Sequence, residues 1–174
     1  MSVYFPQSVN SVGTDTWTFV VALAIKTAAT VAELSAVSAC DLQNSFRPGF
    51  GVAAETERIN DERQGAEVSY QLLGTTSLSF SDMVLIDRPQ DADAAATKKH
   101  LTVLASGAVG YLINRRGIGS GAGNWVAWAT TQKYIGYPVQ VGPQVPLAPG
   151  DSKAFERSIS FAVTGPSFNG TVAA

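Results

Sequence analysis

Apolar and polar residues alternate at both ends of the chain, and this alternation is typical of β-strands that bury one face. In residues 17–25, every second side chain is large and apolar, while most of those between are small or polar. In residues 155–163, apolar side chains alternate with charged and hydroxyl ones until Gly165 and Pro166 end the pattern. The sequence therefore predicts a strand near each end of the chain, each with one face on the core.

Weaker alternation predicts further strands between these two. They are expected at 39–46, 68–72, 77–86, 109–113, 125–131 and 134–141. Gly74 with its two threonines is typical of a hairpin turn between the second and third of these. A series of prolines limits the later part of the chain to an edge strand and irregular turns, because proline offers no N–H to a central ladder. These prolines are Pro138, Pro143, Pro146 and Pro149.

One stretch, at about 91–106, carries a complete helical signal. Asp91 and Asp93 would lie at the N-terminus of the helix, where negative charge interacts favourably with the helix dipole. Three alanines, which favour helix, follow, and Gly107 is a residue at which helices commonly end. Apolar and small side chains recur at helical spacing, which leaves Lys98 and the lysine after it facing water. We therefore expect a single helix lying on a sheet.

The fold class that these patterns predict is mainly β, as a β-sandwich or distorted barrel with one flanking α-helix. At 174 residues the chain is long enough for one domain with a real core. We expect an extended N-terminal arm at 1–16 and a single β-sandwich domain at 17–174. The spacing of Thr30 and Glu33 matches a capping box and predicts one short helical turn.

Residues 47–66 are rich in Pro, Gly and charge, which predicts a long exposed loop. Connections of this length inside a compact domain are uncommon and tend to be functional. The charged residues of this segment are Glu55, Glu57, Arg58, Asp61, Glu62 and Arg63. Their mixed signs suit a polar interface that fixes orientation, while the competing interpretation is a solvated charge cluster.

Composition changes the picture in one respect, which is that the chain is poor in charge. Charged residues make up 15% of the chain, against a usual share of about 25%. Either the surface is rich in Ser, Thr and Gln, or much of it is covered by partners. The net charge of −2 and the pI of about 5.3 show no basic footprint for nucleic acid or anionic lipid. The longest apolar run, 19–25, is too short to cross a bilayer, and no targeting signal is apparent.

Enzymatic chemistry finds little support in the residues. The glycines between 117 and 123 precede a strand-like segment, whereas a phosphate-binding turn has to open a helix, so we expect a hairpin loop there. His100 is the sole histidine, and Ser120 is only a partial match to a nucleophile elbow. No nucleophile with an adjacent base can be assembled from these residues, and we expect no enzymatic activity and no cofactor.

Metal chemistry is equally unsupported. Cys40 is the only cysteine, which excludes an internal disulfide and any site built from several cysteines. We expect Cys40 to be a small buried apolar side chain rather than a reactive thiol. Asp87, Asp91 and Asp93 are better explained as the start of the helix than as a calcium loop.

Several short motifs resemble major tail tube proteins of long-tailed, non-contractile bacteriophages. The C-terminal segment 154–166, which ends in Thr-Gly-Pro, and the Val-Ala-rich end at 171–174 resemble the close of that family's chains. The similarity extends to residues 31–34, 40–42 and 60–63, and to the strand, helix, strand order around Asp91. It covers most of the chain, although the glycine-rich segment 117–123 has no counterpart.

The resemblance implies a virion structural protein, made in the host cytoplasm, whose hexameric rings stack into a tube for DNA delivery. Its partners would be further copies of itself, the tape measure protein and genomic DNA in the lumen without sequence-specific binding, and the tail terminator and tail tip proteins, with no membrane. In that family an extended arm and a long inter-strand loop bridge neighbouring rings. Here these would be Val3, Tyr4 and Phe5 of the arm and the six charged residues of the 47–66 segment.

An alternative from another class is a monomeric or trimeric β-sandwich binding module, such as a capsid decoration or receptor- or carbohydrate-binding domain. Trp125, Trp128, Tyr134 and Tyr137 would then form an exposed ligand platform. Aromatic residues at this density in strands are more often part of a core or an interface. The arm would also have no role in such a module.

Overall fold

The computed structural model describes residues 14–42, 45–61, 70–92, 96–118, 126–148 and 154–174. Its fold is mainly β, as the sequence predicts. The elements are β1 (Asp15–Val20), α1 (Val31–Leu34), β2 (Cys40–Asp41), β3 (Val52–Asp61), β4 (Tyr70–Phe80), β5 (Met83–Ile86), the 3-10 helix η1 (Ala96–Lys98), α2 (Lys99–Val103), β6 (Val109–Arg116), β7 (Lys133–Pro146), β8 (Glu156–Val163) and β9 (Phe168–Thr171).

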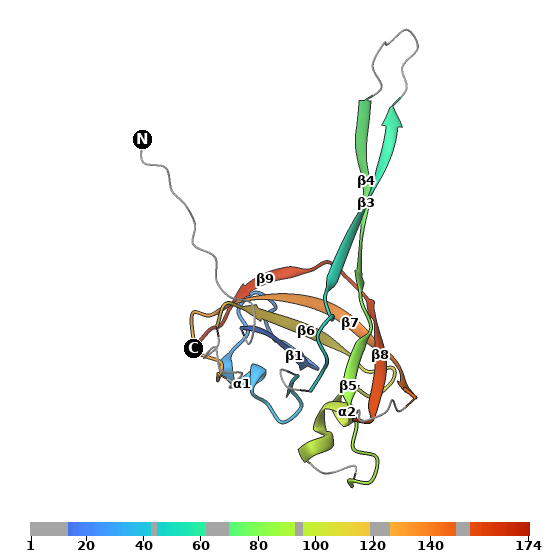
Figure 1. Cartoon of the computed structure of the whole chain (residues 1–174). Helices are drawn as coiled ribbons and strands as arrows, with labels where there is room; N and C mark the ends of the chain where they lie inside the picture. The colour runs from blue at the N-terminus through green and yellow to red at the C-terminus, as the bar shows by residue number, and fades with distance from the viewer. Residues whose placement is uncertain (1–13, 43–44, 62–69, 93–95, 119–125, 149–153) are drawn as a thin grey trace, which may run out of the picture.

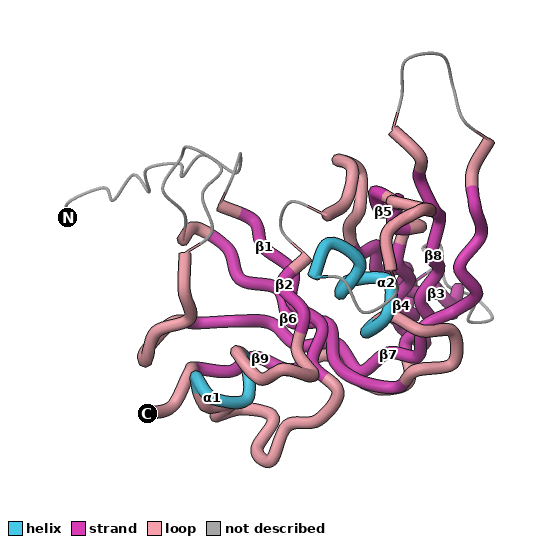
Figure 2. Tube along the Cα trace, turned by 90° about the horizontal axis from the view of Figure 1, so that it is seen from below, coloured by secondary structure: helices cyan, strands magenta, loops and turns pink. Residues whose placement is uncertain are grey.

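One large antiparallel sheet forms the body, with the strand order β2-β1-β6-β7-β8-β5 and with β9 paired to β7. The sheet curls strongly on itself (Figures 1 and 2). The chain leaves β2 at one edge and then pairs with β5 at the other edge, where the N–H of Ile86 donates to the carbonyl of Ser45 and that of Arg47 to the carbonyl of Val84. The body is therefore a distorted barrel.

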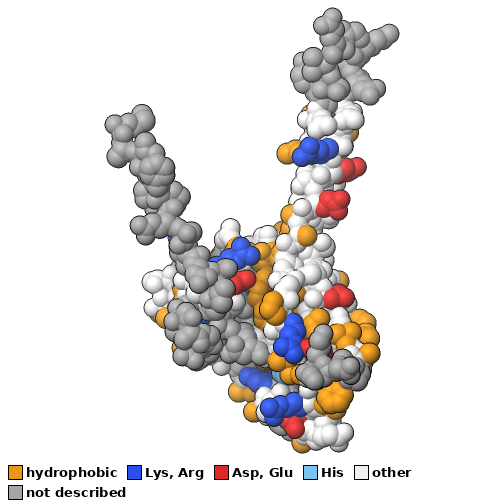
Figure 3. Space-filling model, viewed as in Figure 1, with side chains coloured by type: hydrophobic (Ala, Val, Ile, Leu, Met, Phe, Trp, Pro, Cys, Tyr) orange, Lys and Arg blue, Asp and Glu red, His pale blue; other side chains and the backbone are white. Residues whose placement is uncertain are grey.

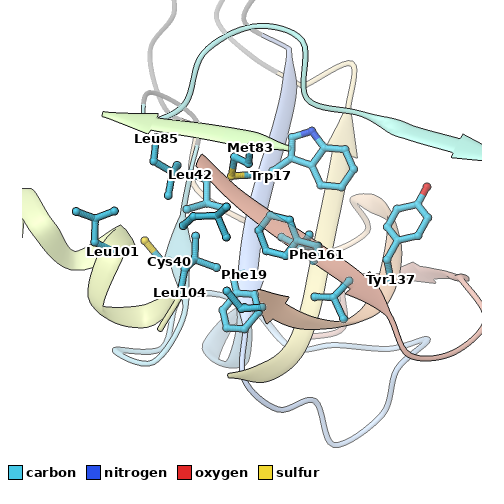
Figure 4. Packing of buried hydrophobic residues seen from close by; sticks show 14 residues of the cluster. Trp17, Phe19, Cys40, Leu42, Met83, Leu85, Leu101, Leu104, Tyr137 and Phe161 are labelled. Carbon is cyan, nitrogen blue, oxygen red and sulfur yellow. The ribbon is translucent and has the colours of Figure 1, made fainter. Parts of the chain in front are cut away.

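Both faces of the sheet are buried, each by its own cluster. We call the concave side the inner face; its cluster joins strands β1, β6, β7 and β8 to α2, and Figure 4 shows Trp17, Phe161 and Tyr137 packed within it. The back face carries a second cluster, which Leu34 of α1 and Val172 near the end of the chain cover. The capping box predicted at the start of α1 is confirmed, because the side chains of Thr30 and Glu33 each accept a hydrogen bond from the backbone N–H of the other residue.

Cys40 lies in the inner cluster beside Leu101 of α2 and Leu104, which follows α2, as expected for a buried cysteine (Figure 4). Its side chain is 5% exposed. Burial raises the pKa of the Cys40 thiol to about 11, because the apolar surroundings disfavour the thiolate.

Arg115 of β6 is fully buried on the back face, where its guanidinium stacks on the ring of Trp128. It donates to the carbonyls of Val126 and Ala127, at 2.6 and 3.2 Å, and to Gln132 Oε1 at 2.9 Å. Burial lowers the pKa of this guanidinium. These bonds hold residues 126–129 in an irregular path, so the strand predicted at 125–131 is absent from its described part.

The prediction that prolines confine the later chain to an edge strand is wrong, because β7 is the central strand. Pro138 lies between the part of β7 that pairs with β9 and the part that pairs with β8. The carbonyl of Pro138 accepts a hydrogen bond from the N–H of Thr164. Because the nitrogen and the carbonyl of one strand residue point to the same side, the proline nitrogen faces the position where the partner strand changes from β9 to β8. Pro143 lies in a bulge, where it and Gly142 together oppose a single residue of β8, Ser160.

The predicted helix is shorter than expected. In the described part of 91–106, helical structure covers η1 and α2 alone. The carboxylate of Asp91 accepts a hydrogen bond from the Thr97 hydroxyl at 2.6 Å. Residues 93–95 lie outside the described residues. Lys98 is buried rather than exposed, and His100 is buried with Nε2 2.8 Å from the carbonyl of Ile86.

The first strand also ends earlier than its alternation predicts, at Val20, and Val21 and Ile25 are exposed. The second predicted strand is reduced to the two residues of β2 and an isolated bridge at Phe46. Apolar alternation does not report where pairing stops, since β1 ends at Val20, opposite Tyr111, although β6 begins at Val109.

The exposed loop predicted at 47–66 is instead mostly β3, which pairs with β4 in a separate two-stranded sheet. The hairpin turn predicted at Gly74 is also wrong, because β4 is continuous from Tyr70 to Phe80. The register shift after Thr56 places Gly74 and Thr75 opposite Glu57 alone. Gly74 therefore marks a β-bulge, where a Cβ would lie 3.0 Å from the Glu57 carboxylate.

We predict that Cys40 resists thiol reagents in the folded protein. A thiol pKa of about 11 leaves a much smaller thiolate fraction at pH 8 than in an unfolded chain, lower by roughly a hundredfold on pKa grounds alone. Labelling with a chromogenic disulfide, with and without denaturant, measures the difference. Equal rates in both conditions would place Cys40 at the surface.

We also predict that Arg115→Met destabilises the fold by roughly 2 to 3 kcal/mol, because it removes a fully buried guanidinium and leaves the carbonyls of Val126 and Ala127 without their donor. Arg116→Met is the matched control; its side chain is exposed, so we expect a change within about 0.5 kcal/mol. Urea unfolding of both variants compares them. Similar midpoints for the two would contradict the anchoring role of Arg115.

Candidate assembly surfaces

The hairpin of β3 and β4 projects far from the body (Figure 1). Its base is fixed by aromatic packing, since Phe50 stacks on Phe80 with ring centroids 5.5 Å apart and meets Trp17 edge-on at 5.0 Å. Phe80 also contacts Tyr137 and Phe161 of the body. The base of the hairpin is therefore continuous with the inner cluster.

The two faces of the hairpin differ in character, because successive side chains of a strand point to opposite faces. One face, which we call the root face, begins with the pair Val52–Phe80 on the body and continues outward to the pair Arg58–Leu73. The opposite face, the acidic face, carries Glu55 and Glu57 and then the pair Ile59–Leu72. Figure 3 shows the basic and acidic side chains of the hairpin directed to different sides.

Large apolar side chains are exposed along the outer half of the hairpin. Leu73 is 79% exposed, Leu72 54% and Ile59 47%. An isolated two-stranded hairpin is at best marginally stable in water, and exposed leucines on it gain nothing from their own chain. This part of the molecule is therefore a surface suited to a partner.

The hairpin contains part of the charged set that the sequence singles out. Glu55, Glu57 and Arg58 are exposed on β3, and Asp61 at its end is half-buried. Glu62 and Arg63 lie outside the described residues, as do Val3, Tyr4 and Phe5 of the predicted arm. The structure thus brings Glu55 and Glu57 together on one face and separates Arg58 onto the other.

A hollow of about 480 Å³ lies on the inner face, at the end of the sheet where β1 begins. We call it the basic hollow, because Arg116 of β6 and Lys133 of β7 both line it. Ile135 contributes an apolar wall, and Asn169 and Thr171 of β9 contribute polar ones. The Nε atom of Arg116 lies 3.6 Å from Oδ1 of Asp15. No pattern in the sequence marks this hollow, because its residues come from separate strands.

The exposed aromatic platform required by a binding module does not form from the described residues. Trp128, Tyr134 and Tyr137 are all buried, and Trp125 lies outside the described part. Tyr134 is fixed by its hydroxyl, which donates to the carbonyl of Lys26 and accepts from the N–H of Ala29. These aromatic residues belong to the core.

The described residues contain no group of three His, Cys, Asp or Glu side chains arranged to hold a metal ion. In the same residues, no helix has the length and apolar character needed to span a membrane.

Comparison with protein families identifies the family of this chain. A family model described as phage tail tube protein matches residues 4–174, which is nearly the whole chain. A search of curated proteins found no match.

Proposed function

The chain belongs to the phage tail tube protein family, a structural component of the virion tail, and from this premise we propose that its copies form hexameric rings. The rings stack into the tube through which DNA is delivered to the host. The hairpin and the N-terminal arm join one copy to the next. In this proposal the protein works by assembly and carries out no reaction.

The observation that supports this proposal best is the hairpin itself. It extends a long ribbon away from the body and exposes Ile59, Leu72 and Leu73, which no part of its own chain covers among the described residues. Burying a leucine side chain is worth roughly 1.5 to 3 kcal/mol. A neighbouring copy that covers these side chains would gain that free energy and hold the ribbon in place.

The charge of the chain suits a conduit. With a net charge of −2, a wall built of these copies would not bind the phosphate backbone tightly, so DNA could slide past. The tape measure protein would occupy the same lumen during assembly, and the tail terminator and tail tip proteins would close the two ends. All of these partners follow from the family and belong to the proposal.

Electron microscopy of the purified protein tests this function. We expect tubes of stacked rings with sixfold symmetry, and masses that rise toward multiples of six copies in a concentration series. A monomer or trimer at every concentration, without tubes, would instead favour a binding module.

We predict that replacing Leu72 and Leu73 by Ser prevents tube formation but leaves the fold intact, because both side chains are exposed and far from the core. Val37→Ser is the matched control, since Val37 is 91% exposed on the body. Negative-stain images report tubes and circular dichroism reports the fold. Normal tubes from the double variant would remove the hairpin from the mechanism.

We also predict that deleting residues 1–10 leaves the fold intact but prevents long tubes. Ordering each residue of an arm costs roughly 1 to 2 kcal/mol, so the arm needs contacts on another copy. Replacing only Val3, Tyr4 and Phe5 by Ser separates apolar contacts from arm length, and we expect the same loss of tubes. If both variants assemble like the unaltered protein, the arm has no part in joining copies.

A further inference from the structure

The acidic face of the hairpin and the basic hollow are complementary in both charge and polarity. We propose that the acidic face of one copy binds the basic hollow of a second copy. This inference rests on the proposed assembly into a tube and names the two surfaces that meet. Nothing in the family match identifies either of them.

The two surfaces cannot meet within one chain. The root face of the hairpin begins on the inner cluster, where Val52 and Phe80 pack, so the acidic face is turned away from its own body. The basic hollow lies on that same inner face, beyond the base of the hairpin. The acidic face of a hairpin is therefore presented outward, to a neighbouring copy.

The chemistry of the two surfaces matches in detail. Glu55 and Glu57 supply two carboxylates on the acidic face. Arg116 and Lys133 supply two cations in the hollow, and Arg116 already lies 3.6 Å from Asp15. An exposed ion pair of this kind contributes little, so the hairpin carboxylates can compete with Asp15 for Arg116.

Next to these charges, each surface also offers apolar side chains. The pair Ile59–Leu72 lies beyond the carboxylates on the acidic face, and Ile135 lines the hollow. Apolar contact then supplies most of the affinity, while the charges fix which way the hairpin lies. The root face carries a positive charge, Arg58, next along β3 from Glu57. If the root face docked instead, Arg58 would be repelled by Arg116 and Lys133.

An interface between two different surfaces of the same chain is head-to-tail. Such an interface always leaves one free hairpin and one free hollow at the ends of a chain of copies, so it grows until it closes into a ring or continues as a filament. In a tube of stacked rings, an interface of this kind joins neighbouring copies either around one ring or from one ring to the next.

Charge reversal is the first experiment. Arg116→Glu with Lys133→Glu should reduce tube yield at least tenfold, and adding Glu55→Lys with Glu57→Lys in the same chain should restore most of it. Reversal that leaves assembly unchanged but alters the retention of DNA would assign the hollow to nucleic acid and overturn the proposal.

Cross-linking gives the decisive measurement. Copies with Glu57→Cys are mixed with copies of a different size that carry Lys133→Cys, and the mixture is assembled and oxidised. In the control, Arg58→Cys on the opposite face of the hairpin replaces Glu57→Cys. We expect a mixed disulfide from the Glu57 pair and at least tenfold less from the Arg58 pair, with buried Cys40 taking no part.

The outcomes separate this inference from the function on which it rests. Absence of tubes from the unaltered protein would defeat the proposed function, and this inference with it. Tubes that form without the Glu57–Lys133 cross-link, or with equal yields from both hairpin faces, would overturn the inference alone.

Discussion

The body of this molecule depends on one constraint: β7 must satisfy its backbone hydrogen bonds while it pairs with three other strands. β6 pairs along one side of it, and β9 and β8 share the other side. Pro138 lies where that side changes partner, and Pro143 lies in a bulge, so neither removes a ladder bond. The bulge also bends the sheet, because Gly142 admits the Ser160 side chain where a Cβ would collide. The bulge thus contributes to the curl that encloses the inner cluster.

The hairpin depends on the body in turn, but only at its base. Phe50 and Phe80 lock into the aromatic cluster around Trp17, which fixes the direction in which the ribbon leaves. Further out, the hairpin has only its ladder and cross-strand pairs such as Thr56 with Thr76, whose hydroxyls are 2.9 Å apart. Its stability therefore falls with distance from the body, while its exposed apolar area rises. In the proposed assembly, a neighbouring copy supplies the contacts that the outer half of the hairpin lacks.

The elements that the sequence predicts well are those with one strongly apolar face, such as β8 and the part of β1 around Trp17 and Phe19. Alternation of apolar and polar residues reports the burial of one face, so it fails where a strand is paired but not buried. β3 is a strand without a buried outer half and looks like a charged loop. The usual contexts of proline and glycine predict an edge strand and a turn, whereas Pro143 and Gly74 lie in bulges and Pro138 lies at a change of partner strand. The basic hollow escapes prediction because only the sheet register unites Arg116 with Lys133.

The low share of charge in this chain is informative once the charges are placed. Apolar surface can hold copies together but does not choose between orientations, since it is non-directional. The hairpin has apolar side chains on both of its faces, Leu73 on one and Leu72 on the other, so apolar contact alone would allow either face to dock. Glu55 and Glu57 occur on one face and Arg58 on the other, which makes the two faces electrostatically distinct. A repeating assembly needs the same choice at every joint, and a few charges segregated in this way are sufficient to impose it.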